Sequence, residues 1–356
     1  MKYLIGLFVS AACIFSAAGC FSHSPLTDEQ KQILGSVRTW GVKGDFSDAE
    51  KLRFHDPVNG KTPLIYTITD RLPDKFRQIL ALEGAEELLE MKDDNGMTAL
   101  QYAAEMPDNT YLKALIAAKA DVNTRDRFGR TPLMNVCRLG NVAAFDLLLS
   151  AGADPEARDQ QDRSIAMFAA AASRNSVQLL KKIRTLDKEN DAWMDFGDNA
   201  QCPLTCAIDA GNREGTDLLL EATCPQDLSK ATDAQNVYAL LAMKHAVKAG
   251  NIHLAKNLIQ RKLPLNRDLS IAYKSLKRVQ LKNWHRTFAR AGIISDGKLP
   301  LSWAAEKDDV EMIKLLLASG ADPYCKDHYG AYPIEYTRKP GAHNTLKRAM
   351  QKAIGK

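Results

Sequence analysis

The stretch Cys202-Pro203-Leu204-Thr205-Cys206 places two thiols four residues apart, a spacing that could serve a metal site or a redox pair. A tetrahedral zinc site requires four ligands, usually arranged as two closely spaced pairs of cysteine or histidine. No histidine lies near this pair in the sequence, and the other cysteines stand singly. The pair alone therefore indicates neither a zinc site nor a catalytic thiol, and its meaning depends on the structural unit that contains it.

Other residue combinations that could support catalysis are incomplete. The stretch Asn59-Gly60-Lys61-Thr62 is similar to the end of a phosphate-binding loop, but His55 replaces the first glycine that this motif requires. The seven histidines lack the spacing of metal ligands, and neither H-E-x-x-H nor G-x-S-x-G occurs. We therefore predict no catalytic residue, no metal site, no cofactor and no small-molecule substrate.

The first 20 residues indicate where the chain acts. One lysine at position 2 precedes an apolar run that ends on small residues immediately before Cys20. This pattern is typical of a secretory signal, so we exclude residues 1–19 from the fold. The segment Ala17-Ala18-Gly19-Cys20 resembles the lipobox of bacterial lipoproteins, which implies that Cys20 is acylated and becomes the first mature residue.

Acylation of Cys20 would hold the chain on a membrane, because each buried acyl methylene contributes about 0.8 kcal/mol. Phe21 stands where aspartate would signal inner-membrane retention, which favours the outer membrane. An ordinary signal peptide cut nearby and an uncleaved N-terminal anchor are the alternatives. We expect a lipidated tether over residues 20–27 and a soluble body in the periplasm or at the cell surface of a bacterium.

A 33-residue period organises the remaining chain. Gly96-Met97-Thr98-Ala99-Leu100 matches Gly129-Arg130-Thr131-Pro132-Leu133 at a step of 33, and Pro300 and Pro333 are again 33 apart. Residues 127–159 carry G-x-T-P-L, then L-G-N, then L-L-L-x-x-G-A-D-P. These motifs resemble the ankyrin repeat, which has this period. The resemblance implies an all-α ankyrin-repeat solenoid, in which helix-turn-helix repeats are joined by loops that resemble β-hairpins.

Residue types account for each part of the repeat. A Thr-Pro pair begins the first helix, because proline at the first helical position gives up no internal hydrogen bond. Gly140, Gly211 and Gly250 end this helix with a left-handed turn, and Gly320 ends a second helix. The leucines at 147–149 bury the second helix against adjacent repeats.

The array needs a cap at each end. We predict N-terminal capping helices within residues 28–57, about eight repeats over 58–340 and a polar capping helix over 341–356. The N-terminal cap should consist of Asp28–Trp40 and Ser47–Phe54, with Thr27 or Asp28 as N-cap.

The chain departs from the family pattern in two respects. Two degenerate repeats should fill residues 234–293, where only Lys248-Ala249-Gly250-Asn251 retains a repeat motif. The histidine that the family carries in the first helix is replaced at four positions, Gln101, Met134, Met167 and Thr205. This replacement removes the family's Thr–His hydrogen bond, so we expect less regular turns there.

The repeat frame also gives the cysteines a packing role. Cys202 aligns with the threonine that begins a first helix, and Cys206 aligns with a core leucine. Free cysteine behaves as a small hydrophobic residue and is among the residues most often buried. We predict that both are structural, with one disulfide involving Cys224 as the alternative in an oxidising compartment.

Ankyrin solenoids present a concave surface of loop tips and first helices, where we expect a protein partner to bind. The candidate contact residues at the tips are Arg125, Arg127, Phe128, Gln160, Gln161, His328 and Tyr329. Phe128 and Tyr329 would act as anchors, because aromatic residues and arginine dominate interface hot spots. Packing of these two rings on neighbouring loops is the alternative.

A second candidate surface is basic. Residues 256–298 carry eleven Lys or Arg but only two Asp, whereas residues 83–94 are mostly acidic. An anionic partner would be attracted to the cations of this segment, among them Lys274, Lys277, Arg278 and Lys282. A solvated helical face is the alternative. Nucleic acid is not expected as a partner, because the cell envelope contains little of it.

We therefore predict a membrane-anchored ankyrin-repeat scaffold that binds an unidentified envelope protein. The alternatives are a module that binds anionic lipid or glycan through residues 256–298, and an enzyme with an unrecognised cysteine-based site. Ankyrin arrays bind other proteins and rarely catalyse, so the resemblance implies that the chain is not an enzyme.

Overall fold

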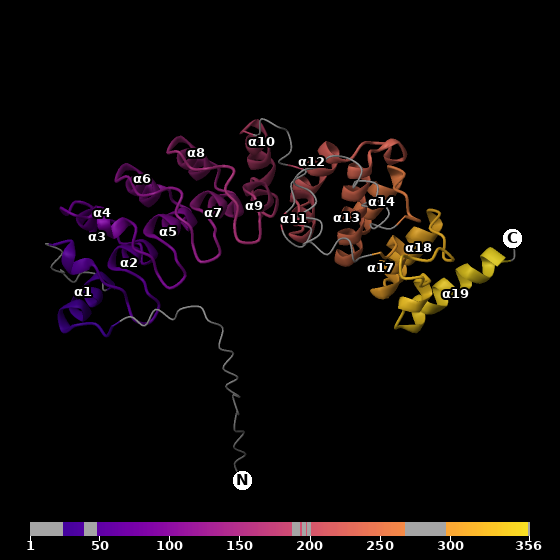
Figure 1. Ribbon diagram of the computed structural model, residues 1–356, viewed down its shortest axis with the longest axis horizontal. Coiled ribbons are helices and arrows are strands. Elements are labelled where there is room, and N and C mark those ends of the chain that lie inside the picture. The colour runs from indigo at the N-terminus through magenta and orange to yellow at the C-terminus, as the bar shows by residue number, and fades with distance from the viewer. Residues whose placement is uncertain are drawn as a thin grey trace, which may run out of the picture.

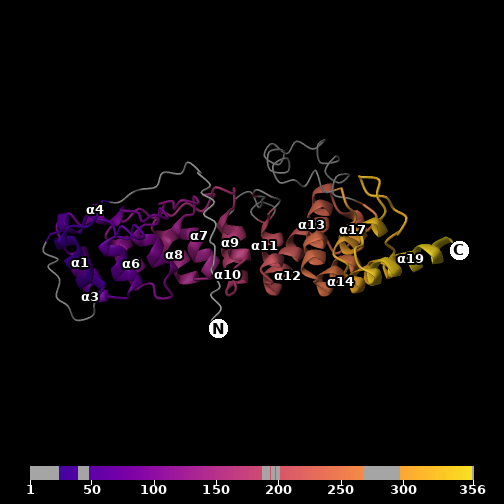
Figure 2. The ribbon, with the colours of Figure 1, turned by 90° about the horizontal axis from the view of Figure 1, so that it is seen from below.

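The computed structural model describes residues 24–38, 48–186, 193, 197, 201–267 and 297–354. All regular elements in these parts of the chain are helices, arranged as successive pairs along a curved array (Figure 1). A view turned by 90° shows the pairs side by side from α1 to α19 (Figure 2). The described part of the chain contains no helix that is long and apolar enough to cross a membrane.

The helices follow one another in a regular order. The array opens with α1 (Asp28–Arg38) and the 3-10 turn η1 (Glu50–Leu52). The repeats then comprise α2 (Pro63–Thr69), α3 (Pro73–Leu80) and α4 (Glu86–Leu89); α5 (Ala99–Glu105) and α6 (Thr110–Ala117); α7 (Pro132–Leu139) and α8 (Val142–Ser150); α9 (Ile165–Ala170) and α10 (Ser176–Leu186); α11 (Pro203–Asp209) and α12 (Arg213–Thr223). After η3 (Leu228–Lys230) come α13 (Asp233–Ala249) and α14 (Ile252–Gln260); α17 (Pro300–Glu306) and α18 (Val310–Ala318); η5 (Pro333–Tyr336) and α19 (Pro340–Ile354).

The first helices begin at side chains that cap them. Thr98 accepts a hydrogen bond from Gln101 N, and Gln101 Oε1 accepts one from Thr98 N at 3.1 Å. Cys202 and Thr205 form the same reciprocal pair at α11. Such a capping box satisfies two backbone donors that a helix leaves free. The residues that replace the family's histidine therefore restore the turn, and the expected irregularity is absent at α5 and α11.

The starts of α7 and α9 differ in their capping hydrogen bonds. At α7, Thr131 caps Met134 N, and Met134 Sδ accepts from Thr131 N at 3.5 Å. At α9, Ser164 makes no side-chain cap bond, and its buried hydroxyl has no partner among the described residues. The expected loss of regularity is thus confined to the start of α9.

The left-handed turns predicted at the ends of first helices are confirmed. Gly140, Gly211 and Gly250 have φ angles of 69°, 69° and 67°. A Cβ atom at Gly140 would lie only 2.1 Å from the carbonyl oxygen of Arg174. Glycine is therefore required there both by the backbone conformation and by the close approach of the next repeat.

One continuous apolar core joins the repeats. Leu100, Leu133, Leu148 and Leu204 are fully buried in it, with exposed fractions of 0%. Each such side chain contributes about 1.5–3 kcal/mol when it leaves water. Because every pair packs on its neighbours in sequence, this burial stabilises the array and holds the loops of adjacent repeats in fixed register.

Helices α13 and α17 are neighbours in the array although the sequence between α14 and α17 is long. These helices pack directly on each other. Asn266 Oδ1 accepts from Asp322 N at 2.8 Å across 56 residues, whereas the equivalent bond from Asp154 N to Asn123 Oδ1 spans 31 residues. The chain therefore holds 25 additional residues between Asn266 and Asp322. Of the two degenerate repeats expected over residues 234–293, the structure describes the helix pair α13 and α14, and residues 268–293 lie outside the described residues.

The N-terminal cap also differs from its prediction. Thr27 Oγ1 accepts from Gln30 N at 3.2 Å, so Thr27 is the N-cap of α1 as expected. The second capping element is the single turn η1 rather than a helix over Ser47–Phe54. Arg53 leaves the helical conformation with a ψ of 64°, and its N–H bonds to Glu50 O, so the element ends after one turn. Trp40 and Ser47 lie outside the described residues.

Candidate interaction surface

Several hairpin loops in the described part of the chain are assembled around a buried aspartate. Asp126 Oδ1 accepts from Phe128 N and Arg130 N, both at 2.8 Å. Asp159 Oδ1 accepts from the amides two and four residues further on, at 3.0 and 2.8 Å. Both aspartates are less than a tenth exposed. We name these loops by their residues, as the 125–130 hairpin and the 158–163 hairpin.

Arginine neutralises the aspartate in both of these hairpins. Arg130 Nε donates to Asp126 Oδ2 at 2.7 Å, and Arg163 Nε donates to Asp159 Oδ2 at 2.8 Å. The arginine lies four residues after the aspartate in each loop, so one hairpin contains the complete ion pair. A buried carboxylate requires such a partner, because an isolated buried charge is costly.

A tyrosine hydroxyl, which carries no charge, donates a hydrogen bond to the aspartate where the loop lacks this arginine. Tyr102 Oη donates to Asp93 Oδ2 at 2.7 Å, and Tyr336 Oη donates to Asp327 Oδ2 at 2.6 Å. Burial, and then the bond to Asp93, raise the pKa of Tyr102 above its ordinary value. Tyr102 therefore stays protonated at neutral pH and keeps its hydrogen atom as a donor. Sequence reasoning missed these contacts, since the partners come from the first helix and the loop.

Adjacent hairpins are joined through their backbones. Arg127 N donates to Asn95 O at 2.8 Å, and Gln160 N donates to Phe128 O at 2.9 Å. A Cβ atom at Gly129 would lie 3.0 Å from Gln160 N, so the loops touch without a side chain between them. The 125–130 hairpin is consequently held on both sides, and its tip is a firm platform.

The predicted anchor Phe128 lies at this tip. Its side chain is 44% exposed. Arg127 Cζ lies 4.7 Å from the ring centroid and Arg130 Cζ lies 5.0 Å from it. Arg125 Nη1 donates to the carbonyl oxygens of Gly129 and Arg158. The ring thus packs on arginines of its own hairpin and still presents a large part of its surface to solvent.

The seven candidate residues do not form one site. Gln160 and Gln161 are exposed on the hairpin next to Phe128. His328 and Tyr329 lie on the 326–331 hairpin beside α17 and α19, toward the other end of the array (Figure 1). Tyr329 is 56% exposed and meets the His328 ring edge to face at 6.1 Å. The structure therefore offers two separate patches.

The other candidate positions lie outside the described residues. They are the four cations of the basic segment and the lipid attachment site, namely Lys274, Lys277, Arg278, Lys282 and Cys20.

The cysteines occupy positions unsuited to chemistry. The five in the described part of the chain are free thiols, so no disulfide involves Cys224 within it. Burial raises the pKa of Cys202 to about 11 and that of Cys206 to about 12. A thiol must ionise to act as a nucleophile or metal ligand. Cys202 is fully buried as predicted, whereas Cys206 is half-buried at the edge of the core. The described residues contain no group of side chains able to hold a metal ion.

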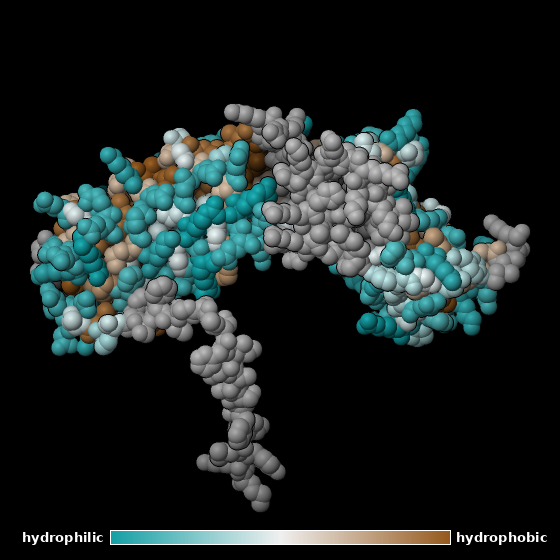
Figure 3. Space-filling view, viewed as in Figure 1, coloured by the Kyte–Doolittle hydropathy of each residue, from teal (hydrophilic) through white to brown (hydrophobic). Residues whose placement is uncertain are grey.

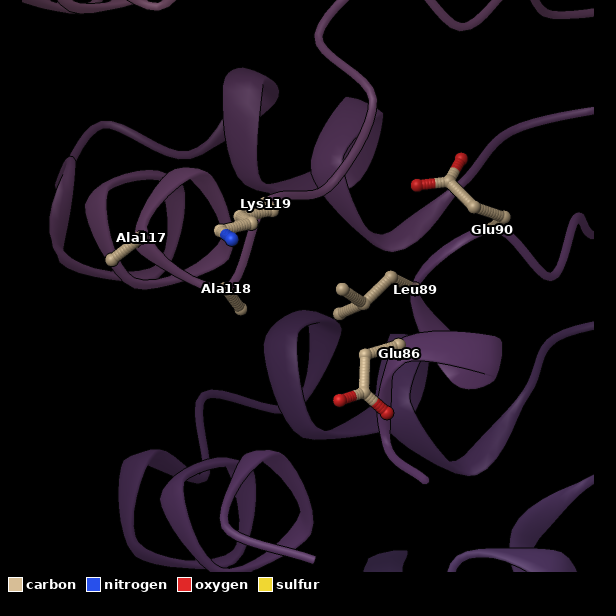
Figure 4. Close-up of a pocket in the computed structure, with 6 residues that line it drawn as sticks. All are labelled: Glu86, Leu89, Glu90, Ala117, Ala118 and Lys119. Atoms are coloured by element: carbon tan, nitrogen blue, oxygen red, sulfur yellow. The ribbon is translucent and has the colours of Figure 1, made fainter. Parts of the chain in front are cut away.

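A shallow hollow lies between α4 and α6, away from the candidate tips. It has a volume of about 510 Å³ and is lined by Glu86, Leu89, Glu90, Ala117, Ala118 and Lys119. Figure 4 shows the first three facing the last three across the open space. The Glu90 carboxylate already accepts a hydrogen bond from Asp121 N, at 2.8 Å.

The visible face of the molecule is mainly hydrophilic, with hydrophobic residues along the outer edge over α6 and α8 (Figure 3).

Comparison with known families agrees with this architecture. The model described as "Ankyrin repeats (3 copies)" matches residues 73–159, 107–191 and 133–230, and the model "Ankyrin repeat" matches residues 296–328. Together they cover more than half of the 356 residues. This chain is an ankyrin-repeat protein. Ankyrin repeats generally mediate binding between proteins, and their fold is typically that of a scaffold rather than an enzyme.

Known relatives match part of this chain. SH3 and multiple ankyrin repeat domains protein 2 of Homo sapiens is 28% identical over 195 residues, which cover 45% of this chain and 10% of the relative. Ankyrin repeat domain-containing protein 63 of Mus musculus is 34% identical over 117 residues, which cover 30% of each protein. The chain thus spans less than a third of either relative.

A solved structure also resembles the ankyrin-repeat protein. The ankyrin repeat domain of Bcl-3, a member of the IkappaB protein family, is 18% identical and has a TM-score of 0.47. The similarity covers 71% of this chain and all of that domain. Among the described residues, the exposed aromatic rings of Phe128 and Tyr329 lie at hairpin tips.

Proposed function

We propose that this ankyrin-repeat protein is a lipid-tethered scaffold that binds another protein of the bacterial cell envelope through its hairpin tips. The proposal rests on the exposed ring of Phe128, which has two guanidinium carbons within 5.0 Å of its centroid and lies on a hairpin whose backbone is bonded to both neighbours. Aromatic and arginine side chains on a firm support are the common anchors of protein interfaces.

Photo-crosslinking in living cells tests this surface. A photoreactive amino acid at Phe128 or Tyr329 should form an adduct with a specific envelope protein. The matched control is Leu186, which is also exposed, at 40%, but lies at the end of α10 rather than on a hairpin. Equal capture of the same protein at Leu186 would contradict binding through the hairpin tips.

The tether rests on the sequence around Cys20. Wild-type protein should incorporate labelled fatty acid and partition into the detergent phase, whereas Cys20→Ala should do neither. Membrane association of Cys20→Ala without label would instead identify an uncleaved anchor, and release of an unlabelled wild-type chain would identify an ordinary signal peptide.

A second function is favoured by the spacing between Asn266 and Asp322. The span between Asn266 and Asp322 is 25 residues longer than the equivalent span between Asn123 and Asp154. Lys274, Lys277, Arg278 and Lys282 belong to this part of the sequence and would attract anionic lipid or glycan. Charge reversal at all four should abolish co-sedimentation with anionic vesicles; unchanged sedimentation would exclude this function.

A further inference from the structure

The hairpins of the array differ in charge, and one of them stands out. Residues 125–130 contain three arginines and one aspartate, a formal charge of +2. The corresponding loops at 92–97, 158–163 and 326–331 have formal charges of −1, 0 and 0 with histidine neutral. The single aspartate of the 125–130 hairpin is buried and paired with Arg130. Its surface charge therefore comes from Arg125 and Arg127.

Neither of these two arginines has a carboxylate partner in the described part of the chain. The Arg125 guanidinium donates to backbone carbonyl oxygens of Gly129 and Arg158. Arg127 is exposed, and its guanidinium lies on the Phe128 ring. Both positive charges are available to an anion that approaches from solvent.

The Phe128 ring restricts the conformations of the Arg127 side chain before an anion binds. A guanidinium that stacks on an aromatic ring keeps its N–H groups in its own plane, directed outward from the ring edge. Carboxylates bind this edge through two parallel hydrogen bonds. The stacking contact reduces the rotamer freedom that Arg127 would lose on binding, which lowers the entropic cost of the complex.

The neighbouring hairpins shape the charge around this tip. Asp94 lies on the 92–97 hairpin, whose formal charge is −1, whereas Asp162 on the 158–163 hairpin pairs with Arg158 at 3.8 Å. Negative charge therefore lies on one side of the cationic tip, where it would repel a long polyanion or an anionic membrane. A short acidic segment of a protein can reach Arg125 and Arg127 without covering the 92–97 hairpin.

We propose that the 125–130 hairpin binds an acidic segment of the partner protein, with carboxylates on Arg125 and Arg127 and an apolar side chain on Phe128. This inference rests on the proposed function, since it gives the chemistry of the partner at the same tip.

Fluorescence anisotropy tests the chemistry directly. The probe is a labelled twelve-residue peptide of glutamate with a central tryptophan, and its control carries glutamine in place of every glutamate. The full-length chain in detergent should bind the glutamate peptide at least about tenfold more tightly, a difference that matches one charge-assisted hydrogen bond. Equal binding of the two peptides would overturn the inference.

Matched variants locate the binding site. Arg127→Glu should weaken binding of the glutamate peptide by at least about tenfold and reduce its salt dependence. Arg348→Glu reverses one exposed charge on α19 and should bind as wild type does. Phe128→Ala should also weaken binding, and circular dichroism checks that all variants fold. Equal affinity of the two charge-reversed variants would place the peptide elsewhere and refute the proposal.

Competing anions complete the test. A twelve-nucleotide single strand of DNA and phosphatidylglycerol vesicles should each bind no more tightly than the glutamate peptide. If either binds this tip more tightly, the proposal that a protein segment occupies it is wrong. Crosslinking at Phe128 with no preference for the glutamate peptide would reject the acidic partner and leave the proposed scaffold function standing.

Discussion

The substitution Asp126→Ala tests how the 125–130 hairpin is assembled. The carboxylate of Asp126 accepts from Phe128 N and Arg130 N at 2.8 Å and from Arg130 Nε at 2.7 Å. Hydrogen bonds to a charged group contribute about 1.5–3 kcal/mol each, and removing one member of a buried ion pair costs about 3–5 kcal/mol. The Arg130 side chain is 23% exposed, so water recovers part of this loss. We expect destabilisation of about 2–4 kcal/mol.

Urea unfolding followed by circular dichroism measures this loss. Asp217→Ala is the control, because Asp217 is exposed on α12 and should change stability by less than about 0.5 kcal/mol. Hydrogen exchange at the Phe128 and Arg130 amides adds a local measurement, since repeat arrays can unfold in parts. Faster exchange at both amides is the expected result. Wild-type stability together with unchanged exchange would refute the assembly of this hairpin around Asp126.

Three further predictions concern the tyrosine, glycine and cysteine positions. Because burial and a carboxylate raise the folded-state pKa of Tyr102, its contribution to stability is complete below about pH 10 and is lost as the pH rises further. Tyr102→Phe should therefore flatten the alkaline decline in a pH series of urea midpoints, and an unaltered decline would contradict this role. Gly140→Ala should lower the thermal midpoint more than Gly152→Ala, because both positions have positive φ but only the first lacks space for a Cβ atom. Equal shifts would contradict the close approach. Cys202→Thr should restore a hydroxyl cap and change the free energy of unfolding by less than about 1 kcal/mol, as measured by denaturant titration. Loss of a catalytic activity in this variant would support the alternative of an enzyme with a cysteine-based site.

Most of the fold could be predicted from local sequence patterns. The Thr-Pro starts and the glycines at 140, 211 and 250 act within a few residues, and the structure confirms the turns that they predict. The number of repeats between α13 and α17 depends instead on which helices pack together. Degenerate residues leave that choice to tertiary contacts, such as the packing of α13 on α17 and the bond from Asp322 N to Asn266.

The candidate surface could be predicted only in part. The exposure of Phe128 and Tyr329 follows from their places at loop tips, and both rings are exposed. The choice between arginine and tyrosine as partner of the loop aspartate was missed, because Tyr102 reaches Asp93 only after the first helix packs under the loop. The sequence could have indicated the arginine-paired loops, because Arg130 and Arg163 each follow the loop aspartate by four residues. Asn135, fully buried with both amide atoms unpartnered among the described residues, has no explanation in the sequence.

The central claim is that the 125–130 hairpin is the surface through which this ankyrin-repeat protein binds its partner. The most direct measurement is in-cell photo-crosslinking at Phe128 in the wild-type and Arg127→Glu backgrounds, with Leu186 as the exposed control position. We expect one protein adduct at Phe128 that is weakened by Arg127→Glu and absent at Leu186. An adduct of equal yield in both backgrounds, or an equal adduct at Leu186, would contradict it.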